Sequence, residues 1–356
     1  MKTFFAVLSA ATLSLALLLA GCGSSGQPPA ASGNAEGPAA ADGGQAGQPK
    51  SNLKIGMVTD VGGVNDNSFN QSAWEGLQRL QQETGIEVKY LQSTGDAQYV
   101  PNLNEFVKSG WDLTWGIGLL LGDHVKKVAE ENPEAKLAII DAVVEAPNVA
   151  SITFKEHEGS FLVGVVAGMM TKTGKVGFVG GMDIPVIKRF EAGFKAGVAA
   201  ANPNVEVITI YTGFFDKPDL GKSAASTMYG QGADIVFHAS GATGDGVFNE
   251  AKDRKAKGEA VWVIGVDKDQ SLTFGNEITL TSMIKRVDEA VYRVSKELAD
   301  GKFAGGQAVE LGLKENGVDL AETSKDNVPA DVLQKVEEYK QKIINGELTV
   351  PQEPAK

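Results

Sequence analysis

Residues 54–76 read KIGMVTDVGGVNDNSFNQSAWEG and contain an apolar run, a polar loop and the start of an amphipathic segment. The run KIGMVT predicts a buried strand, and the segment that follows the loop predicts a helix that starts near Phe69. Ser68 and Gln71 fit the S-x-x-Q capping box at this helix start. This stretch therefore predicts one strand–loop–helix unit of an α/β fold.

The position of Phe69 admits two interpretations. Phe69, Ala73, Leu77 and Leu80 follow one another at helical spacing, so the ring can be the first member of a buried stripe. Its place next to the end of a strand also lets the ring face a crevice beyond the sheet. The sequence alone leaves both interpretations open.

The same alternation continues over residues 52–356, a length that suits two domains. Runs rich in Val and Ile predict ten strands: KIGMVT, EVKYLQS, LTWGIGL, KLAIID, VASITF, KVGFVG, VEVITIY, DIVFHAS, VWVIGV and ITLTSMI. Helical patterns separate them, which indicates parallel sheets covered by helices on both faces. We expect two such sheets with a cleft between them.

Three of these strands end in an aspartate, at Asp60, Asp141 and Asp267. Ligands of open α/β sheets bind beyond the carboxyl ends of the strands, so these carboxylates are candidates to converge at one site. An aspartate after a strand can instead be a helix cap or a turn former. The loop after the first strand has no lysine, so it suits hydrogen-bond donors better than an anion.

A second aromatic cluster, Phe214 and Phe215 in YTGFFDKPD, follows the run VEVITIY. On a second lobe, one of these rings would lie opposite Phe69. Two rings on opposite walls of a cleft can hold one planar ligand between them.

The sequence shows no nucleophile with a base, and we predict no catalytic residue, no metal site and no cofactor. The three histidines have no zinc-site spacing, and G-x-S-x-G is absent. The run ASGATGDGV, residues 239–247, is glycine-rich but lacks the G-x-G-x-x-G register and carries Asp245. Phosphate binding there is therefore disfavoured.

The N-terminal stretch MKTFFAVLSAATLSLALLLAGC predicts a signal peptide over residues 1–21. Cys22 is the only cysteine, and its place after Leu-Ala-Gly resembles the lipobox of bacterial lipoproteins, although an incidental cysteine after a plain signal peptide is the alternative. Residues 22–51 predict a lipidated cysteine and a flexible tether. The formal net charge of −12 becomes −13 when Lys2 is removed with the signal peptide, which argues against nucleic acid as a partner.

Several motifs in one order resemble the basic membrane protein family of substrate-binding lipoproteins. They are TDVGGVNDNSFNQSAWEG, STGDAQYVP, AIIDAVVE, FKEHEGSFLVG, FEAGFKAG, ASGATGDGVFNEAKD, VWVIGVDKDQ and LTSMIKRVD, and the resemblance covers nearly all of residues 52–315. Within the family, the sequence is most similar to members that are receptors for purine nucleosides.

The resemblance implies a two-lobed periplasmic-binding-protein fold of the first type, with three crossovers and the ligand in the interlobe cleft. One lobe would comprise residues 52–154 and about 272–315, and the other residues 155–271 and about 316–356. The implied function is capture of guanosine, inosine or adenosine for an ABC permease, by a monomer anchored to the bacterial cell membrane and facing the periplasm or exterior. The ligand-binding residues that the motifs imply are Asp60, Phe69, Asn70, Asp141, Phe214, Gly241, Asp267 and Lys285.

Two other functions remain open at this level. A receptor for another neutral polar ligand, such as a sugar or a pyrimidine nucleoside, would have a similar cleft. A nucleoside hydrolase would also place aspartates around a ribose, but it needs them clustered on a calcium ion, and no D-x-D run follows Asp60.

Overall fold

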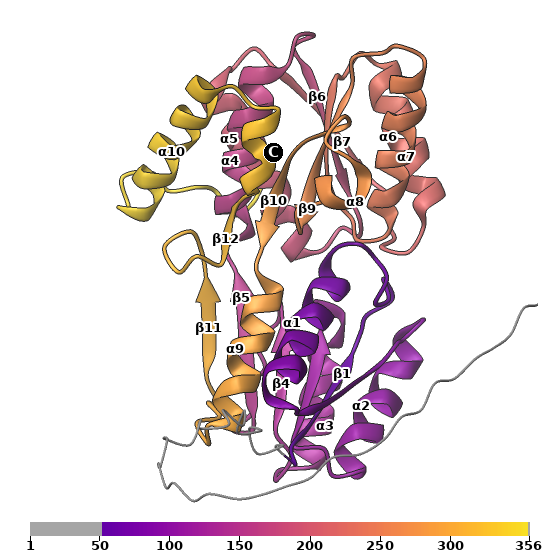
Figure 1. Ribbon diagram of the computed structural model, residues 1–356, viewed down its shortest axis with the longest axis vertical. Helices are drawn as coiled ribbons and strands as arrows, with labels where there is room; N and C mark the ends of the chain where they lie inside the picture. The colour runs from indigo at the N-terminus through magenta and orange to yellow at the C-terminus, as the bar shows by residue number, and fades with distance from the viewer. Residues whose placement is uncertain (1–51, 355–356) are drawn as a thin grey trace, which may run out of the picture. The chain divides into compact units, whose positions relative to one another are not determined.

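The computed structural model describes residues 52–354 (Figure 1). Every structural statement below refers to these residues. The predicted signal peptide, the lipidation site Cys22 and the tether up to Ser51 lie outside them.

The first sheet contains six parallel strands in the order β11-β5-β4-β3-β1-β2. Because each neighbouring pair is parallel, helices connect most of its strands across the faces of the sheet. Its elements are β1 (Lys54–Val58), α1 (Phe69–Thr84), β2 (Glu87–Leu91), α2 (Tyr99–Lys108), β3 (Leu113–Ile117), α3 (Gly122–Glu131), β4 (Leu137–Ile140), β5 (Val149–Phe154), α9 (Val287–Ala299) and β11 (Ala308–Leu311).

The second sheet has the order β12-β10-β9-β8-β6-β7, and only β12 is antiparallel to its neighbour. Its elements are α4 (Glu156–Met170), β6 (Lys175–Gly180), α5 (Pro185–Ala201), β7 (Glu206–Tyr211), α6 (Pro218–Gly230), β8 (Ile235–Ala239), α7 (Thr243–Ala256), β9 (Trp262–Asp267), α8 (Ser271–Phe274), β10 (Thr279–Lys285), β12 (Val318–Leu320) and α10 (Ala330–Ile344).

The chain passes between the two sheets three times, after Phe154, after Lys285 and between Leu311 and Val318 (Figure 1). We call residues 52–154 and 287–311 the first lobe, and residues 155–285 and 318–354 the second lobe. The expected return to the first lobe at about residue 272 falls before β10, whereas the chain leaves the second sheet only after Lys285. The strand β10, which ends at Lys285, pairs with β9 and therefore belongs to the second lobe.

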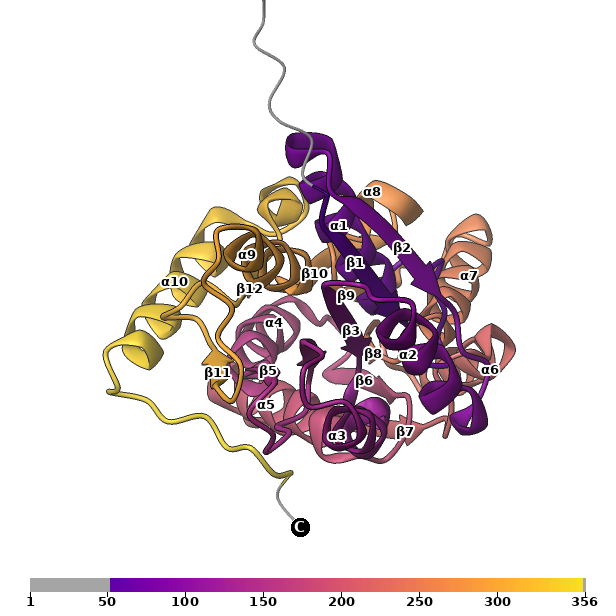
Figure 2. The same ribbon diagram turned by 90° about the horizontal axis from the view of Figure 1, so that it is seen from below.

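Both faces of each sheet are buried, as parallel sheets require. In the first lobe, α1 and α9 lie on one side of the sheet and α2 and α3 on the other (Figure 2). Successive residues of β1 show this division, since Met57 packs with the helices of one face and Val58 with those of the other. In the second lobe α4 and α5 cover one face, and α6 and α7 cover the other.

All ten predicted strands are present, as β1 to β10, and the α/β fold with two mostly parallel sheets is confirmed. The two strands that the sequence does not predict are short. The strand β11 is largely exposed and β12 has three residues, so neither has the apolar run that marks a buried strand.

Candidate functional site

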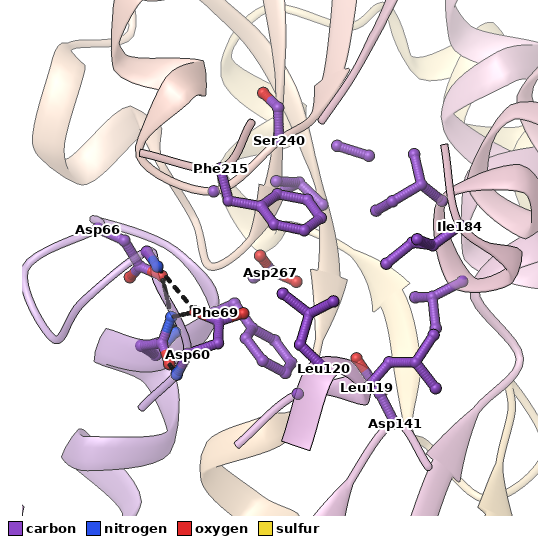
Figure 3. A pocket seen from close by; sticks show the side chains of 18 of the residues that line it. Asp60, Asp66, Phe69, Leu119, Leu120, Asp141, Ile184, Phe215, Ser240 and Asp267 are labelled. Atoms are coloured by element: carbon purple, nitrogen blue, oxygen red, sulfur yellow. Dashed lines mark hydrogen bonds between the residues drawn. The ribbon is translucent and has the colours of Figure 1, made fainter. Parts of the chain in front are cut away.

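A cavity lies at the carboxyl ends of both sheets and takes its walls from both lobes (Figure 3). Its empty volume, including its opening to solvent, is about 570 Å³. Seven of the eight binding residues that the motifs imply line it: Asp60, Phe69, Asn70, Asp141, Gly241, Asp267 and Lys285. The three strand-end aspartates therefore meet in one place.

The eighth residue, Phe214, does not line the cavity in this structure. The Phe214 side chain is 47% exposed, while the neighbouring Phe215 lines the cavity. The ring of Phe215 lies over Gly181, where a β-carbon would be only 2.3 Å from it. Figure 3 shows the rings of Phe215 and Phe69 at the cavity, one from each lobe.

The loop between β1 and α1 is held by the buried carboxylate of Asp66. Its Oδ1 accepts hydrogen bonds from the backbone N–H groups of Ser68 and Gln71, both at 3.0 Å. Its Oδ2 accepts from the backbone N–H of Asn70 at 2.9 Å and from Asn70 Nδ2 at 3.0 Å. The predicted start of α1 at Phe69 is correct, but the capping box is wrong. Ser68 makes no capping bond through its side chain, and Gln71 donates to Glu75 instead.

Asn70 in turn fixes the carboxylate of Asp60. Asn70 Nδ2 donates to Asp60 Oδ1 at 2.8 Å, and the N–H of Gly62 donates to the same oxygen at 2.9 Å. Burial raises the pKa of Asp60 to about 6, although these two bonds oppose the rise. The other oxygen, Oδ2, lies beside Gly118, which has φ +111° and has room for no side chain there, since a β-carbon would be 3.1 Å from that oxygen. One oxygen of Asp60 is thus occupied and the other remains for a ligand.

Asp141 and Asp267 have left-handed backbone conformations, with φ of 70° and 65°. Residues other than glycine adopt such angles rarely, and such strain gathers at functional sites. In both cases the turn follows the last residues of a parallel strand and brings the carboxylate to the cavity. Gly241, in the loop after β8, also has a positive φ of 55°.

The loop before α1 also binds the second lobe. Asn67 Nδ2 donates to Asp245 Oδ2 at 3.1 Å, and Gln270 Nε2 donates to the carbonyl oxygen of Asn67 at 3.0 Å. The Ser68 hydroxyl donates to Asp267 Oδ2. We call these three contacts the interlobe clasp. They hold the two walls of the cavity together in this structure.

Burial is also the main influence on the acids of the clasp. It raises the pKa of Asp267 to about 7, against the opposing effects of Lys285 and the Ser68 hydroxyl. It raises the pKa of Asp245 to about 6, although the bond from Asn67 opposes this. Behind the clasp, His238 Nε2 lies 2.8 Å from Gln270 Oε1, and burial lowers the pKa of this histidine to about 4. Both carboxyl groups of the clasp, those of Asp245 and Asp267, therefore have pKa values above that of an ordinary aspartate.

The sequence did not identify the apolar wall of the cavity, which consists of Leu119, Leu120, Ile184, Val186, Ile187 and Phe190. These residues follow β3 and β6, so their places at strand ends were a usable signal. Their residue types carry no chemistry, and without a motif they resemble ordinary core residues. Figure 3 shows Leu119, Leu120 and Ile184 at the cavity together with the two rings, and the labelled aspartates lie around them.

Within residues 52–354 no group of three or more His, Cys, Asp or Glu side chains is placed to hold a metal ion. No helix in that part of the chain is long and apolar enough to cross a membrane.

Comparison with known proteins agrees with this geometry. Residues 53–354 match a family described as "ABC transporter substrate-binding protein PnrA-like". The chain is 40% identical, over 86% of its length and 92% of the relative, to the "ABC transporter nucleoside-binding protein BmpA" of Lactococcus lactis. It is 36% identical to "Basic membrane protein A" of Borreliella afzelii, with 84% of this chain and 91% of that protein aligned.

A solved structure is similar over most of the chain. An ABC transporter solute-binding protein of Aeropyrum pernix superposes with a TM-score of 0.79 and 34% identity, covering 85% of this chain and 94% of that one. The chain belongs to the PnrA-like family of ABC transporter substrate-binding proteins, which includes proteins named as basic membrane proteins.

Proposed function

We propose that the protein captures purine nucleosides outside the cytoplasm and delivers them to an ABC importer. The observation that carries this proposal is the pair of rings, Phe69 from the first lobe and Phe215 from the second, in one cavity that the three strand-end aspartates also line. The name of the Lactococcus lactis relative, a nucleoside-binding protein, supports the same ligand class.

The purine base is assigned to the slot between Phe69 and Phe215. Stacking of a base on an aromatic ring contributes about 1–3 kcal/mol. Donors on the edge of the base reach Asp60, whose orientation Asn70 fixes. Guanine and hypoxanthine both carry such donors, and adenine carries an amino group, so all three bases remain candidates.

The ribose is assigned to the side of the cavity that holds Asp141, Gly241, Asp267 and Lys285. Hydroxyl groups that donate to carboxylates form charge-assisted hydrogen bonds, which are about twice as strong as neutral ones. Lys285 can donate to an acceptor oxygen of the sugar. Closure of the two lobes around the ligand then buries it and changes the surface that the permease meets.

The anchor belongs to the same proposal. We infer that Cys22 is acylated and that the protein, a monomer, is held at the outer face of the cell membrane through a flexible tether. In membrane fractionation, Cys22→Ala should move the protein to the soluble fraction. Retention of this variant on the membrane would contradict the anchor without affecting the ligand assignment.

The role proposed here is binding without turnover. The function of the family as substrate-binding components supports it. Incubation of the purified protein with inosine, followed by chromatography, should return inosine alone. Accumulation of hypoxanthine and ribose would instead indicate a hydrolase.

Mass spectrometry of the compound released when the purified full-length protein is denatured tests the ligand class. We expect a purine nucleoside. A sugar or a pyrimidine nucleoside in stoichiometric amount would overturn the purine assignment and favour a receptor for another neutral polar ligand.

A further inference from the structure

A buried ion cluster lies where one crossover enters the second lobe, at Glu156, and another leaves it, at Lys285. Lys285 is the last residue of β10, and Glu156 is the first residue of α4. Lys285 Nζ is 2.6 Å from Asp141 Oδ2 and 3.1 Å from Glu156 Oε1. Arg189 Nε donates to Glu156 Oε2 at 2.6 Å. Lys285 is 1% exposed and Glu156 is fully buried, so the cluster has little contact with water.

The two carboxylates around Lys285 differ in their relation to the cavity. Asp141 and Lys285 line it, whereas Glu156 does not. A lysine ammonium has three protons. Lys285 donates one of them to Asp141 Oδ2, whereas Glu156 Oε1 is held by charge and accepts no hydrogen bond within the described residues. A further proton of Lys285 can therefore be donated to a group in the cavity. Glu156 can therefore affect a bound ligand only indirectly, through its ion pair with Lys285.

Aromatic rings complete the surroundings of the ammonium. Lys285 Nζ lies 5.0 Å from the centre of the Phe69 ring, 5.1 Å from that of Phe154 and 5.7 Å from that of Phe190. Ring faces attract a cation but do not fix the directions of its protons. The carboxylate of Asp141 accepts a hydrogen bond from Lys285, and the carboxylate of Glu156 adds an ion pair from the second lobe.

The cluster contains two basic side chains, Lys285 and Arg189, and two acidic ones, Asp141 and Glu156. Burial raises the pKa of Asp141, against the opposing charge of Lys285. Burial lowers the pKa of Lys285, but Asp141 and Glu156 outweigh that effect and the net direction is upward. Burial likewise raises the pKa of Glu156, and the charges of Lys285 and Arg189 more than reverse it. Lys285 and Glu156 are therefore charged at neutral pH. Loss of the Glu156 carboxylate leaves Arg189 without this partner and Lys285 with Asp141 as its remaining ion-pair partner.

The free oxygen of Asp141 shows what Glu156 prevents. Asp141 Oδ1 is buried and accepts no hydrogen bond within the described residues. Without Glu156, the ammonium of Lys285 would turn to both oxygens of Asp141. That movement would remove a donor and an acceptor from the cavity at once.

We propose that Glu156 is a positioning residue for ligand binding, which holds the Lys285 ammonium so that one proton of Lys285 and one oxygen of Asp141 stay available to the bound ligand. The inference rests on the proposed nucleoside function and adds to it a residue outside the cavity.

Calorimetric titration of the full-length protein with inosine tests the inference. Glu156→Gln keeps the shape of the side chain but removes its charge, and it should weaken inosine binding by about ten- to hundredfold because the buried ion pair that holds Lys285 is lost. Glu191→Gln is the matched control. Glu191 is also buried in the second lobe and bonded to Lys195 and Tyr211, but it lies outside the cavity. The control should bind within about twofold of the wild type.

Two further variants separate positioning from folding. In Glu156→Gln/Arg189→Gln the unpaired cation is gone, so the melting temperature should recover while inosine affinity stays low. In a Lys285→Met background, Glu156→Gln should have no further effect on affinity. Recovery of affinity together with stability, or an undiminished effect without Lys285, would overturn the inference. If the wild type itself fails to bind inosine, it is the proposed function that fails.

Discussion

The two walls of the cavity are held in different ways. In the first lobe, Asp66 and Asn70 fix the loop and Asp60 through bonds within that lobe. In the second lobe, Asp245, Asp267 and Lys285 take partners from the first lobe, namely Asn67, Ser68 and Asp141. The difference indicates that the first wall keeps its shape in an open molecule, while the second acquires its final arrangement on closure.

The largest effect should come from breaking the first wall. Asp66→Ala leaves the N–H groups of Ser68, Asn70 and Gln71 without their acceptor, and each buried unpaired group costs about 1–3 kcal/mol. We expect the free energy of unfolding, measured by urea denaturation, to fall by about 3 kcal/mol, with guanosine binding weakened more than a hundredfold.

Gln71→Ala is the control for this variant. It should change stability by less than about 0.5 kcal/mol, because Gln71 contributes only a partly buried bond to Glu75. A loss equal to that of Asp66→Ala would restore the capping-box interpretation.

Substitution of the aromatic rings tests whether both walls contact the base of the bound nucleoside. Phe69→Ala and Phe215→Ala should each weaken guanosine binding by about 1–3 kcal/mol in calorimetry. Phe214→Ala should bind as the wild type does, since this exposed side chain lies outside the cavity. A strong loss with Phe214→Ala and none with Phe215→Ala would reverse the assignment of the stacking ring.

The buried Asp267 of the second wall should make the free energy of unfolding depend on pH. The pKa of Asp267 is raised mainly by burial, from 3.8 to about 7, so between these values the folded protein binds more protons than the unfolded chain. Its contribution therefore becomes less favourable as the pH rises through this window. Lowering the pH from 8 to 5 should stabilise the wild type relative to Asp267→Asn by about 2 kcal/mol.

Urea denaturation of both proteins at pH 5, 6.5 and 8 measures this difference, and the contributions of His157 and His238 cancel in it. A constant difference across the three pH values would show that Asp267 is not buried as described.

The smallest effect should come from the interlobe clasp away from the ligand. Asp245 lies outside the cavity lining, so Asp245→Ala removes a bond that favours closure without touching the ligand. Affinities for guanosine, inosine and adenosine should fall by the same factor, about three- to tenfold. A change in their ratios would place Asp245 in ligand recognition instead.

Much of the fold and of the cavity lining can be predicted from the sequence. The features that cannot be predicted have physical reasons. Val- and Ile-rich runs predicted every long strand, and the aspartates after three of them predicted the site. The cap at α1 was missed because Asp66 reaches it through a folded loop, which local spacing does not reveal. The choice between Phe214 and Phe215 depended on contact with Gly181, a residue distant in sequence. Glu156 gave no signal, because its role depends on the neighbours that folding gives it.

Titration of the wild type with guanosine, guanosine monophosphate and guanine tests the central claim most directly. We expect tight binding of guanosine alone. The monophosphate would bring about two negative charges beside Asp60, Asp141 and Asp267, with Lys285 the one cation that lines the cavity within the described residues. Guanine would leave the carboxylates of the sugar side without their donors. Tight binding of the monophosphate would contradict the electrostatic account, and equal binding of guanine would contradict the assignment of the ribose.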